Sequence, residues 1–167
     1  MSAAAQSLIH PFDAGLLDPP GAGRGFFLRA EIPDGEWVRA LACEQTFKPG
    51  CEALRRAGFR VGNELGQDGG FDVGLCLLSK HKIENFANIA RGWSLLRPGG
   101  LLVCAGANDT GAGSVAREVK AVLGEIDSLS KHHCKVFWFR RAEGPVPEKL
   151  VAWERAGRLQ RVEAIGG

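Results

Sequence analysis

Residues 71–82 read FDVGLCLLSKHK, an apolar run that ends abruptly in a polar segment. The run 71–78 has almost no polar alternation, which is typical of a strand buried on both faces of a parallel sheet. In α/β sheets that bind nucleotides, ligands lie where the strands end. The segment Ser79-Lys80-His81-Lys82 is therefore a candidate active site, the remains of one, or only the turn from a strand into a helix.

The segments around this strand alternate between strand and helix patterns. Residues 81–100 carry an apolar stripe at helical spacing, and Pro98-Gly99-Gly100 is expected to end that helix. Further helices are expected at 47–58 and about 114–123, and strands at 25–30, 37–44, 59–65, 101–106, 125–131 and 133–140. This order predicts an α/β fold: a Rossmann-like, doubly wound, mostly parallel seven-stranded sheet with a C-terminal antiparallel hairpin.

The chain of 167 residues is expected to form one main domain. Residues 1–24 are a Pro/Gly-rich lead-in with the turn cluster DPPGAGRG, and residues 25–142 are the domain itself. Residues 143–167 are expected to be a linker or docking tail with a short amphipathic stretch. The ending Gly166-Gly167 suggests that the sequence is truncated.

Composition excludes several function classes. The net charge of +2 gives no global field for nucleic acid or membrane, although a local basic patch is compatible with it. No apolar run is long enough to span a membrane, and the start lacks the basic region of a signal peptide, so a cytoplasmic protein is expected. The five cysteines form no C-x-x-C pair, which favours buried, reduced thiols over a redox or metal site.

Two glycine-rich segments and one acidic residue are candidate cofactor contacts. GAGRG (21–25) precedes a strand, whereas a phosphate-binding loop must follow one, so a flexible turn is the better interpretation. GANDTGAGS (106–114) does lie between a strand and a helix. There Gly106 and Asp109 fit either a turn with a helix cap or a ligand contact. Glu44, at the end of the second strand, is placed where this class of fold binds ribose hydroxyls.

Two basic segments are candidate RNA contacts. Lys80, His81 and Lys82 follow the fourth strand, at the expected start of a helix. A positive charge is unfavourable at a helix N-terminus, and this cost favours a functional role for the two lysines. Lys131 and Lys135 belong to a second basic run that is interleaved with aromatic residues. The alternative to phosphate binding is that the basic residues are only solvated surface. The alternative to base stacking is that the aromatic residues pack in the core.

The stretch FDVGLCLLSKHKIENFANIARGWSLLRPGGLLVCAGANDTGAGSVAREV (71–119) resembles class I S-adenosylmethionine-dependent methyltransferases. It is similar above all to the amino-terminal half of the 16S rRNA guanine-N2 methyltransferases of the C type, in the "methyltransferase small" group. The resemblance covers about residues 25–142. It implies a degenerate amino-terminal domain that is followed, in the same protein, by a catalytic copy that binds S-adenosylmethionine.

The sequence departs from that family at both halves of the active site. Active members carry a D-x-G-x-G-x-G segment after the first strand, where this chain has LRAEIPDGE (28–36) with a single glycine. Active members also carry Asn-Pro-Pro-aromatic after the fourth strand, where this chain has Leu77-Leu78-Ser79-Lys80. Positioning is most of what methyl transfer needs from the protein, because the donor is already activated.

The resemblance and its departures together predict a domain without catalytic residues, metal or bound cofactor. Its expected role is to support RNA binding and the stability of a catalytic copy, with ribosomal RNA or the small ribosomal subunit as partner and no membrane. One alternative is an active methyltransferase with an atypical donor pocket built from Glu44, Asp109 and the loop after the fifth strand. Another is a scaffold without RNA contact.

Overall fold

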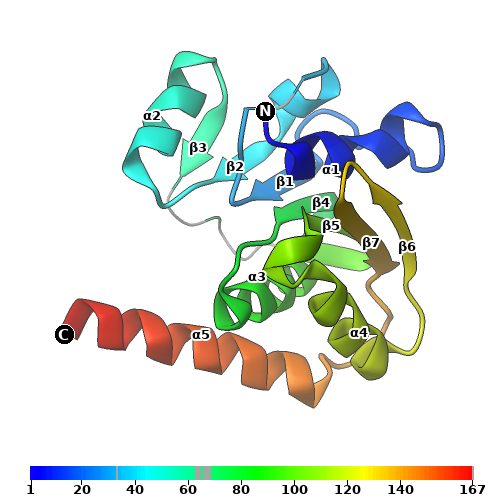
Figure 1. Ribbon diagram of the computed structural model, residues 1–167, viewed down its shortest axis with the longest axis vertical. Helices are drawn as coiled ribbons and strands as arrows, with labels where there is room; N and C mark the ends of the chain where they lie inside the picture. The colour runs from blue at the N-terminus through cyan, green and yellow to red at the C-terminus, as the bar shows by residue number, and fades with distance from the viewer. Residues whose placement is uncertain (33, 63–64, 66–68, 167) are drawn as a thin grey trace.

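The computed structural model describes residues 1–32, 34–62, 65 and 69–166 (Figure 1). Its helices are α1 (Ala3–Asp13), α2 (Lys48–Arg56), α3 (Lys82–Leu95), α4 (Ala112–Leu123) and α5 (Glu148–Gly166), with two short 3-10 helices, η1 (Trp37–Ala40) and η2 (Asn108–Thr110). Its strands are β1 (Gly25–Leu28), β2 (Ala42–Glu44), β3 (Arg60–Gly62), β4 (Phe71–Leu77), β5 (Leu96–Ala107), β6 (Asp127–Lys131) and β7 (Cys134–Arg140).

The strands form one seven-stranded sheet in the order β3-β2-β1-β4-β5-β7-β6. Strands β1 to β5 are parallel to one another. Strand β7 is antiparallel to β5, and β6 and β7 form an antiparallel hairpin. This confirms the predicted fold class. β4 lies between β1 and β5, and most of its residues are buried, as its continuous apolar sequence indicated.

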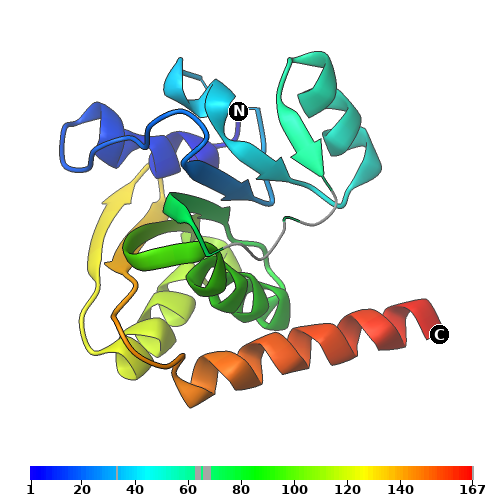
Figure 2. The same cartoon turned by 180° about the vertical axis from the view of Figure 1, so that it is seen from behind.

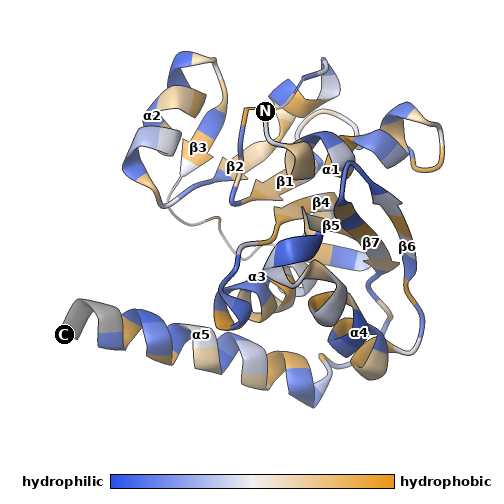
Figure 3. Cartoon of the chain, in the orientation of Figure 1, coloured by the Kyte–Doolittle hydropathy of each residue, from blue (hydrophilic) through white to orange (hydrophobic). Residues whose placement is uncertain are grey.

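The sheet is covered by helices on both faces (Figures 1 and 2). Helices α3 and α4 cover one face and pack on alternate strand residues such as Leu102 and Cys104, and α5 packs on α3. Helices α1 and α2 cover the other face, which presents Leu101 and Val103. Figure 3 shows β1 and β4 largely in hydrophobic colours, whereas α5 mixes hydrophilic and hydrophobic residues along its length.

Gly74 shows why the sheet core needs a glycine at the centre of β4. Phe26 is its partner on β1, and a Cβ atom at position 74 would lie 2.0 Å from the ring of Phe26. The ring of Phe26 therefore occupies the place of a side chain on β4. It also makes an edge contact with Phe71, with ring centroids 5.3 Å apart.

Helix α1 was not predicted from the sequence. Ala5, Leu8, Ile9 and Phe12 are buried against the sheet, at the spacing of one helix face. Pro11 and the turn cluster that follows hid this spacing in the sequence. Ser2 begins the helix, because its side chain accepts a hydrogen bond from the Ala5 amide at 3.1 Å.

Several predicted element boundaries were wrong. Residues 37–40 form η1 and not a strand, so the second strand is limited to Ala42–Glu44. The helix predicted at 81–100 ends at Leu95, because Leu96 already pairs with Phe71 in the sheet. The third strand, predicted at 59–65, is Arg60–Gly62; residues 63 and 64 lie outside the described residues.

The predicted tail contains a long helix. Helix α5 begins at Glu148 and packs on α3 through Leu150, Trp153 and Gly157, and then projects beyond the body of the domain (Figure 2). The rings of Phe86 and Trp153 lie 4.6 Å apart between centroids. Residue 157 must be small, because a Cβ atom there would lie 2.3 Å from the Cβ of Ala87.

The cysteines are buried free thiols, as predicted from the sequence. Burial raises the pKa of Cys43 to about 12, so its thiol stays protonated. Cys76 and Cys104 are partners on adjacent strands, and burial raises the pKa of Cys104 as well. Among the described residues, none of the helices has the length and apolar character needed to cross a membrane.

Candidate functional site

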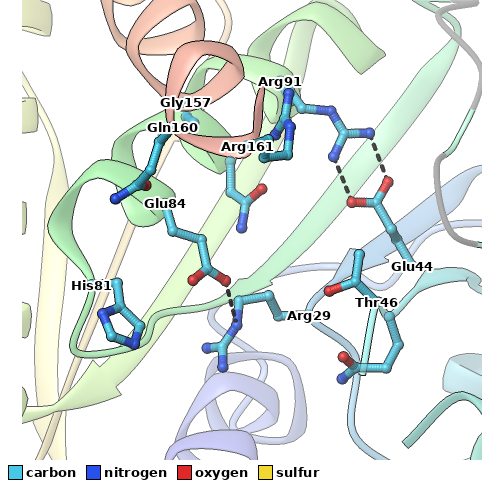
Figure 4. A pocket seen from close by; sticks show the side chains of 12 residues that line it. Arg29, Glu44, Thr46, His81, Glu84, Arg91, Gly157, Gln160 and Arg161 are labelled. Carbon is cyan, nitrogen blue, oxygen red and sulfur yellow. Dashed lines mark hydrogen bonds and ion pairs between the residues drawn. The ribbon is translucent and has the colours of Figure 1, made fainter. Parts of the chain in front are cut away.

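A cavity of about 520 Å³ opens at the carboxyl ends of β1 and β2. The strand order reverses between β1 and β4, and ligands of doubly wound sheets bind in the crevice at that position. Helices α3 and α5 form its other walls (Figure 4). The lining residues are Arg29, Glu44, Gln45, Thr46, His81, Glu84, Ala87, Asn88, Arg91, Gly157, Gln160 and Arg161.

One ion pair closes the end of β2. Arg91 of α3 donates to both carboxylate oxygens of Glu44, at 2.5 and 2.6 Å, and the two side chains are only 13% and 9% exposed. The amide of Leu65 donates to the same carboxylate at 3.0 Å. The structure thus places Glu44 at the predicted strand end, with both of its oxygens engaged by protein donors.

A second ion pair lies where the chain leaves β1. Arg29 follows the strand with a φ of 56°, and its Nε lies 3.0 Å from Oε1 of Glu84 (Figure 4). Its Nη1 also donates to the carbonyl of Leu77, at 3.3 Å, so the guanidinium bridges the ends of β1 and β4. A glycine-rich donor loop would have to pass through this same region of the sheet edge.

The turn after β4 is locked onto α3. The Ser79 amide donates to Oδ1 of Asn85, and Nδ2 of Asn85 donates back to the Ser79 carbonyl, both at 2.8 Å. Oγ of Ser79 accepts from the His81 amide at 3.0 Å. Both backbone groups of Ser79 are therefore occupied by the protein. This is the position where active members of the resembling family carry the residues that hold the substrate amine.

The structure brings the five basic RNA candidates to one edge of the sheet. Lys80 and His81 follow β4, and Lys82 begins α3, where its Nζ donates to Ser114 Oγ at 3.1 Å. Lys131 ends β6, and Lys135 pairs with Gly106 near the carboxyl end of β5. All of them except Lys135 are exposed, and Lys135 is half-buried.

The hairpin that carries Lys131 and Lys135 is held rigidly. Its two turn residues, His132 and His133, both adopt positive φ values of 52° and 58°. The Asn108 amide donates to the His133 carbonyl at 3.0 Å, and Ser7 of α1 donates its hydroxyl to the Lys131 carbonyl at 2.9 Å. The backbone positions of Lys131 and Lys135 along this edge are therefore set by the fold.

The other two cofactor candidates lie away from the cavity. Gly106 packs within β5, where an added Cβ atom would lie 2.9 Å from the Cβ of Leu78. Asp109 is exposed in η2, after β5, and β1 and β4 separate that strand from β2 and Glu44. Three strand spacings of about 4.8 Å separate β2 from β5 by roughly 14 Å. The predicted helix cap by Asp109 is also wrong, because the N-cap of α4 is Gly111 and no side chain caps that helix.

Sequence reasoning missed most of the polar lining of the cavity. Glu84, Asn88 and Arg91 share one face of α3, at positions i, i+4 and i+7. This polar stripe was visible in the sequence of an otherwise apolar helix. The pairing of Arg91 with Glu44 spans 47 residues and could not be foreseen from local pattern. Gln160 and Arg161 were missed because α5 was not predicted at its full length.

Comparison with known proteins identifies the fold. No family model and no curated protein matches the chain. Among solved structures, the 16S rRNA N2 G1207 methyltransferase of T. thermophilus, in complex with AdoMet and guanosine, is similar with a TM-score of 0.67 and 18% identity. The similarity covers 87% of this chain but only 41% of that one, so this chain spans about two fifths of that protein.

Two further methyltransferases are similar over more of their own length. A SAM-dependent methyltransferase of Thermotoga maritima, described as a possible histamine N-methyltransferase, has a TM-score of 0.56 and 14% identity, covering 83% of this chain and 90% of that one. The tRNA methyltransferase TrmI of Aquifex aeolicus has a TM-score of 0.57 and 8% identity, covering 86% and 71%. At these identities the likeness shows the fold alone: the chain has a Rossmann-like methyltransferase fold.

Proposed function

We propose that this chain is a methyltransferase-like domain that has lost methyl transfer and instead helps to hold ribosomal RNA for a catalytic methyltransferase domain in the same protein. The resemblance over residues 25–142 and the fold similarity to an rRNA methyltransferase support this proposal. The observation that carries it is the state of the sheet edge. There Arg91 and Asn85 engage Glu44 and Ser79, the residues at the positions that would contact a methyl donor and a substrate amine.

The donor side of the edge supports the loss of methyl transfer. A donor ribose would need a carboxylate at the end of β2 as hydrogen-bond acceptor, but Glu44 is held by two donors of Arg91. Releasing it would separate this carboxylate from an arginine that is only 13% exposed. Breaking a buried ion pair in this way costs about 3–5 kcal/mol, which a ligand would have to supply.

The substrate side supports the same conclusion. A methyl acceptor has to be held in line with the donor, and this needs acceptor groups that face the ligand. At the end of β4, the backbone amide of Ser79 donates to the Asn85 side chain, and the Ser79 carbonyl accepts from it. Asn85 itself is 2% exposed, so its amide is not available to a substrate.

The basic edge supports RNA as the partner. Lysines from three separate segments lie along the same carboxyl edge of the sheet, at 80, 82, 131 and 135. Phosphate contacts of this kind fix the register of an RNA without reading its sequence. They also make the affinity fall as the salt concentration rises.

A salt series tests RNA binding directly. The affinity of the chain for a single-stranded 16S rRNA fragment would be measured by fluorescence anisotropy at increasing salt. We expect Lys80→Glu/Lys82→Glu to lower the affinity at least tenfold and to flatten the salt slope by about 0.7 for each phosphate that is no longer neutralised. The matched control is Lys120→Glu/Lys149→Glu, which makes the same charge change with exposed lysines near the C-terminus of α4 and the N-terminus of α5.

Equal losses of affinity in the two double variants would mean that only net charge matters, and the basic edge would then not be the binding surface. No RNA binding by the unmodified chain would favour a scaffold without RNA contact.

An active methyltransferase with an atypical donor pocket is the second candidate. The position of Glu44 at the end of β2, on the wall of a 520 Å³ cavity, favours it. This candidate requires a donor ribose to share Glu44 with Arg91 or to displace it, and donor titration distinguishes it from the main proposal.

A further inference from the structure

We propose that the cavity between β1, β2, α3 and α5 takes one unpaired nucleotide of an RNA chain, with the base against Asn88 and the phosphate at Arg161. This inference rests on the proposed function, because the RNA has to lie along the basic edge to reach the cavity. It goes beyond that function by giving the former donor region a ligand of its own.

The side chain of Asn88 is available for a ligand in the cavity. It is 7% exposed and lines the cavity, and none of the described residues forms a hydrogen bond with its side-chain amide. Its amide atoms reach the cavity space, so water or a ligand there supplies the partner that polar side chains of this kind nearly always have. An amide offers donors and an acceptor side by side, which is the pattern that reads the edge of a nucleobase.

The charge of the cavity favours an anion. Its charged lining residues are Arg29, Arg91, Arg161, Glu44 and Glu84, so three positive groups face two negative ones. Both carboxylates are paired, with Arg91 and Arg29. Arg161 has no ion pair with the described residues and is exposed at the mouth. A phosphate would be attracted by this surplus, whereas a cationic sulfonium donor would be repelled.

The size and surroundings of the cavity fit a nucleotide. A volume of about 520 Å³ lies within the ~300–1,000 Å³ that is usual for small-molecule sites. His81 lines the cavity and lies between Lys80 and Lys82, so a phosphate backbone at those lysines passes its entrance. Phe47 directly follows Thr46 of the lining and is 67% exposed, so it is available to stack with a neighbouring base outside the cavity.

The test compares nucleotide and RNA binding in matched variants. Arg161→Gln removes the proposed phosphate contact, and Arg155→Gln makes the same change at an exposed position of α5 that does not line the cavity. Asn88→Leu removes the base contact, with its folding checked by circular dichroism. Ligands are the four nucleoside 5′-monophosphates, an unstructured RNA oligonucleotide, and the same RNA sequence as a duplex.

We expect Arg161→Gln and Asn88→Leu each to weaken binding of the unstructured RNA by about tenfold, with Arg155→Gln unchanged and the duplex bound less tightly than the single strand. Unchanged RNA affinity in both cavity variants would overturn the inference, while the proposed function would stand if Lys80→Glu/Lys82→Glu still weakened binding. Cavity-dependent binding of monophosphates without RNA binding would assign the cavity to a free nucleotide and overturn both the RNA source and the proposed function. An unmodified chain that binds neither ligand would overturn both proposals.

Discussion

The interior of the sheet and its carboxyl edge use their side chains in different ways. The interior keeps the close packing of a methyltransferase fold, with Gly74 of β4 against the ring of Phe26. At the edge, arginines bridge the strand ends, and the turn after β4 is locked to α3 by Asn85. The contrast teaches that a sheet needs its core residues to fold, whereas the groups at its strand ends can take on other contacts without loss of the fold.

The largest effect should come from separating Glu44 and Arg91. We expect Glu44→Gln to lower the free energy of unfolding by about 3 kcal/mol, because it leaves a guanidinium that is 13% exposed without this counter-charge. Urea denaturation followed by circular dichroism measures this. The control is Arg91→Met combined with Glu44→Gln, in which removing both charges should restore much of the stability. A Glu44→Gln variant as stable as the unmodified chain would show that this carboxylate is kept for a ligand and not for the fold.

The next effect concerns the interior. Gly74→Ala places a Cβ atom 2.0 Å from the ring of Phe26, and we expect a destabilisation of about 1–3 kcal/mol because a close-packed core relaxes poorly. Gly113→Ala is the control. A Cβ atom at that position of α4 meets only the end of the Arg117 side chain, at 3.7 Å, so better helix propensity should make the variant slightly more stable. Equal thermal midpoints for the two variants would contradict the close approach at β4.

A smaller effect is expected where α5 meets α3. Gly157→Ala brings two Cβ atoms to 2.3 Å, so α5 should loosen at a cost of about 1–2 kcal/mol. Limited proteolysis should then cleave α5 faster, with the rest of the domain intact. Adding Ala87→Gly removes the clash and should restore resistance. If the double variant is cleaved as fast as Gly157→Ala, the packing between these two residues does not hold the helix.

The smallest effect concerns pH. Hydrogen bonds from Arg24 and Arg97 lower the pKa of Asp72 from its ordinary 3.8 to about 2, so the folded state favours the charged carboxylate. The stabilisation is present above pH 3.8 and is lost as the pH falls toward about 2. The side chain is 31% exposed, so we expect Asp72→Asn to cost less than about 1 kcal/mol at neutral pH and to flatten the acid limb of the stability curve. An acid limb that is the same in Asp72→Asn and in the unmodified chain would contradict this pairing.

The sequence predicted the sheet and its order of elements because these follow from local patterns. The apolar run of β4 and the helical stripe from Ile83 to Trp93 are examples. The edge could be predicted only in part. Glu44 and the lysines were found because strand ends are recognisable, but their partners Arg91 and Ser114 are distant in sequence. Ion pairs across the sheet edge depend on tertiary contacts, which no local periodicity encodes.

The boundaries that were missed have a similar cause. Arg141 donates to the carbonyls of Trp93 and Leu96, so a residue from beyond β7 satisfies the end of α3 and lets β5 begin immediately. No local pattern indicates that the helix stops before Pro98. In α1, Pro11 and the turn cluster after it hide the apolar spacing, and in α5 the apolar positions are few.

Titration of the chain with S-adenosylmethionine by calorimetry tests the central claim most directly. The ion pairs at the strand ends predict no saturable heat for the unmodified chain, under conditions in which single-stranded RNA binds. Saturable donor binding at a single site, with a micromolar dissociation constant and no such binding in Glu44→Gln, would contradict the account and make this chain a donor-binding methyltransferase.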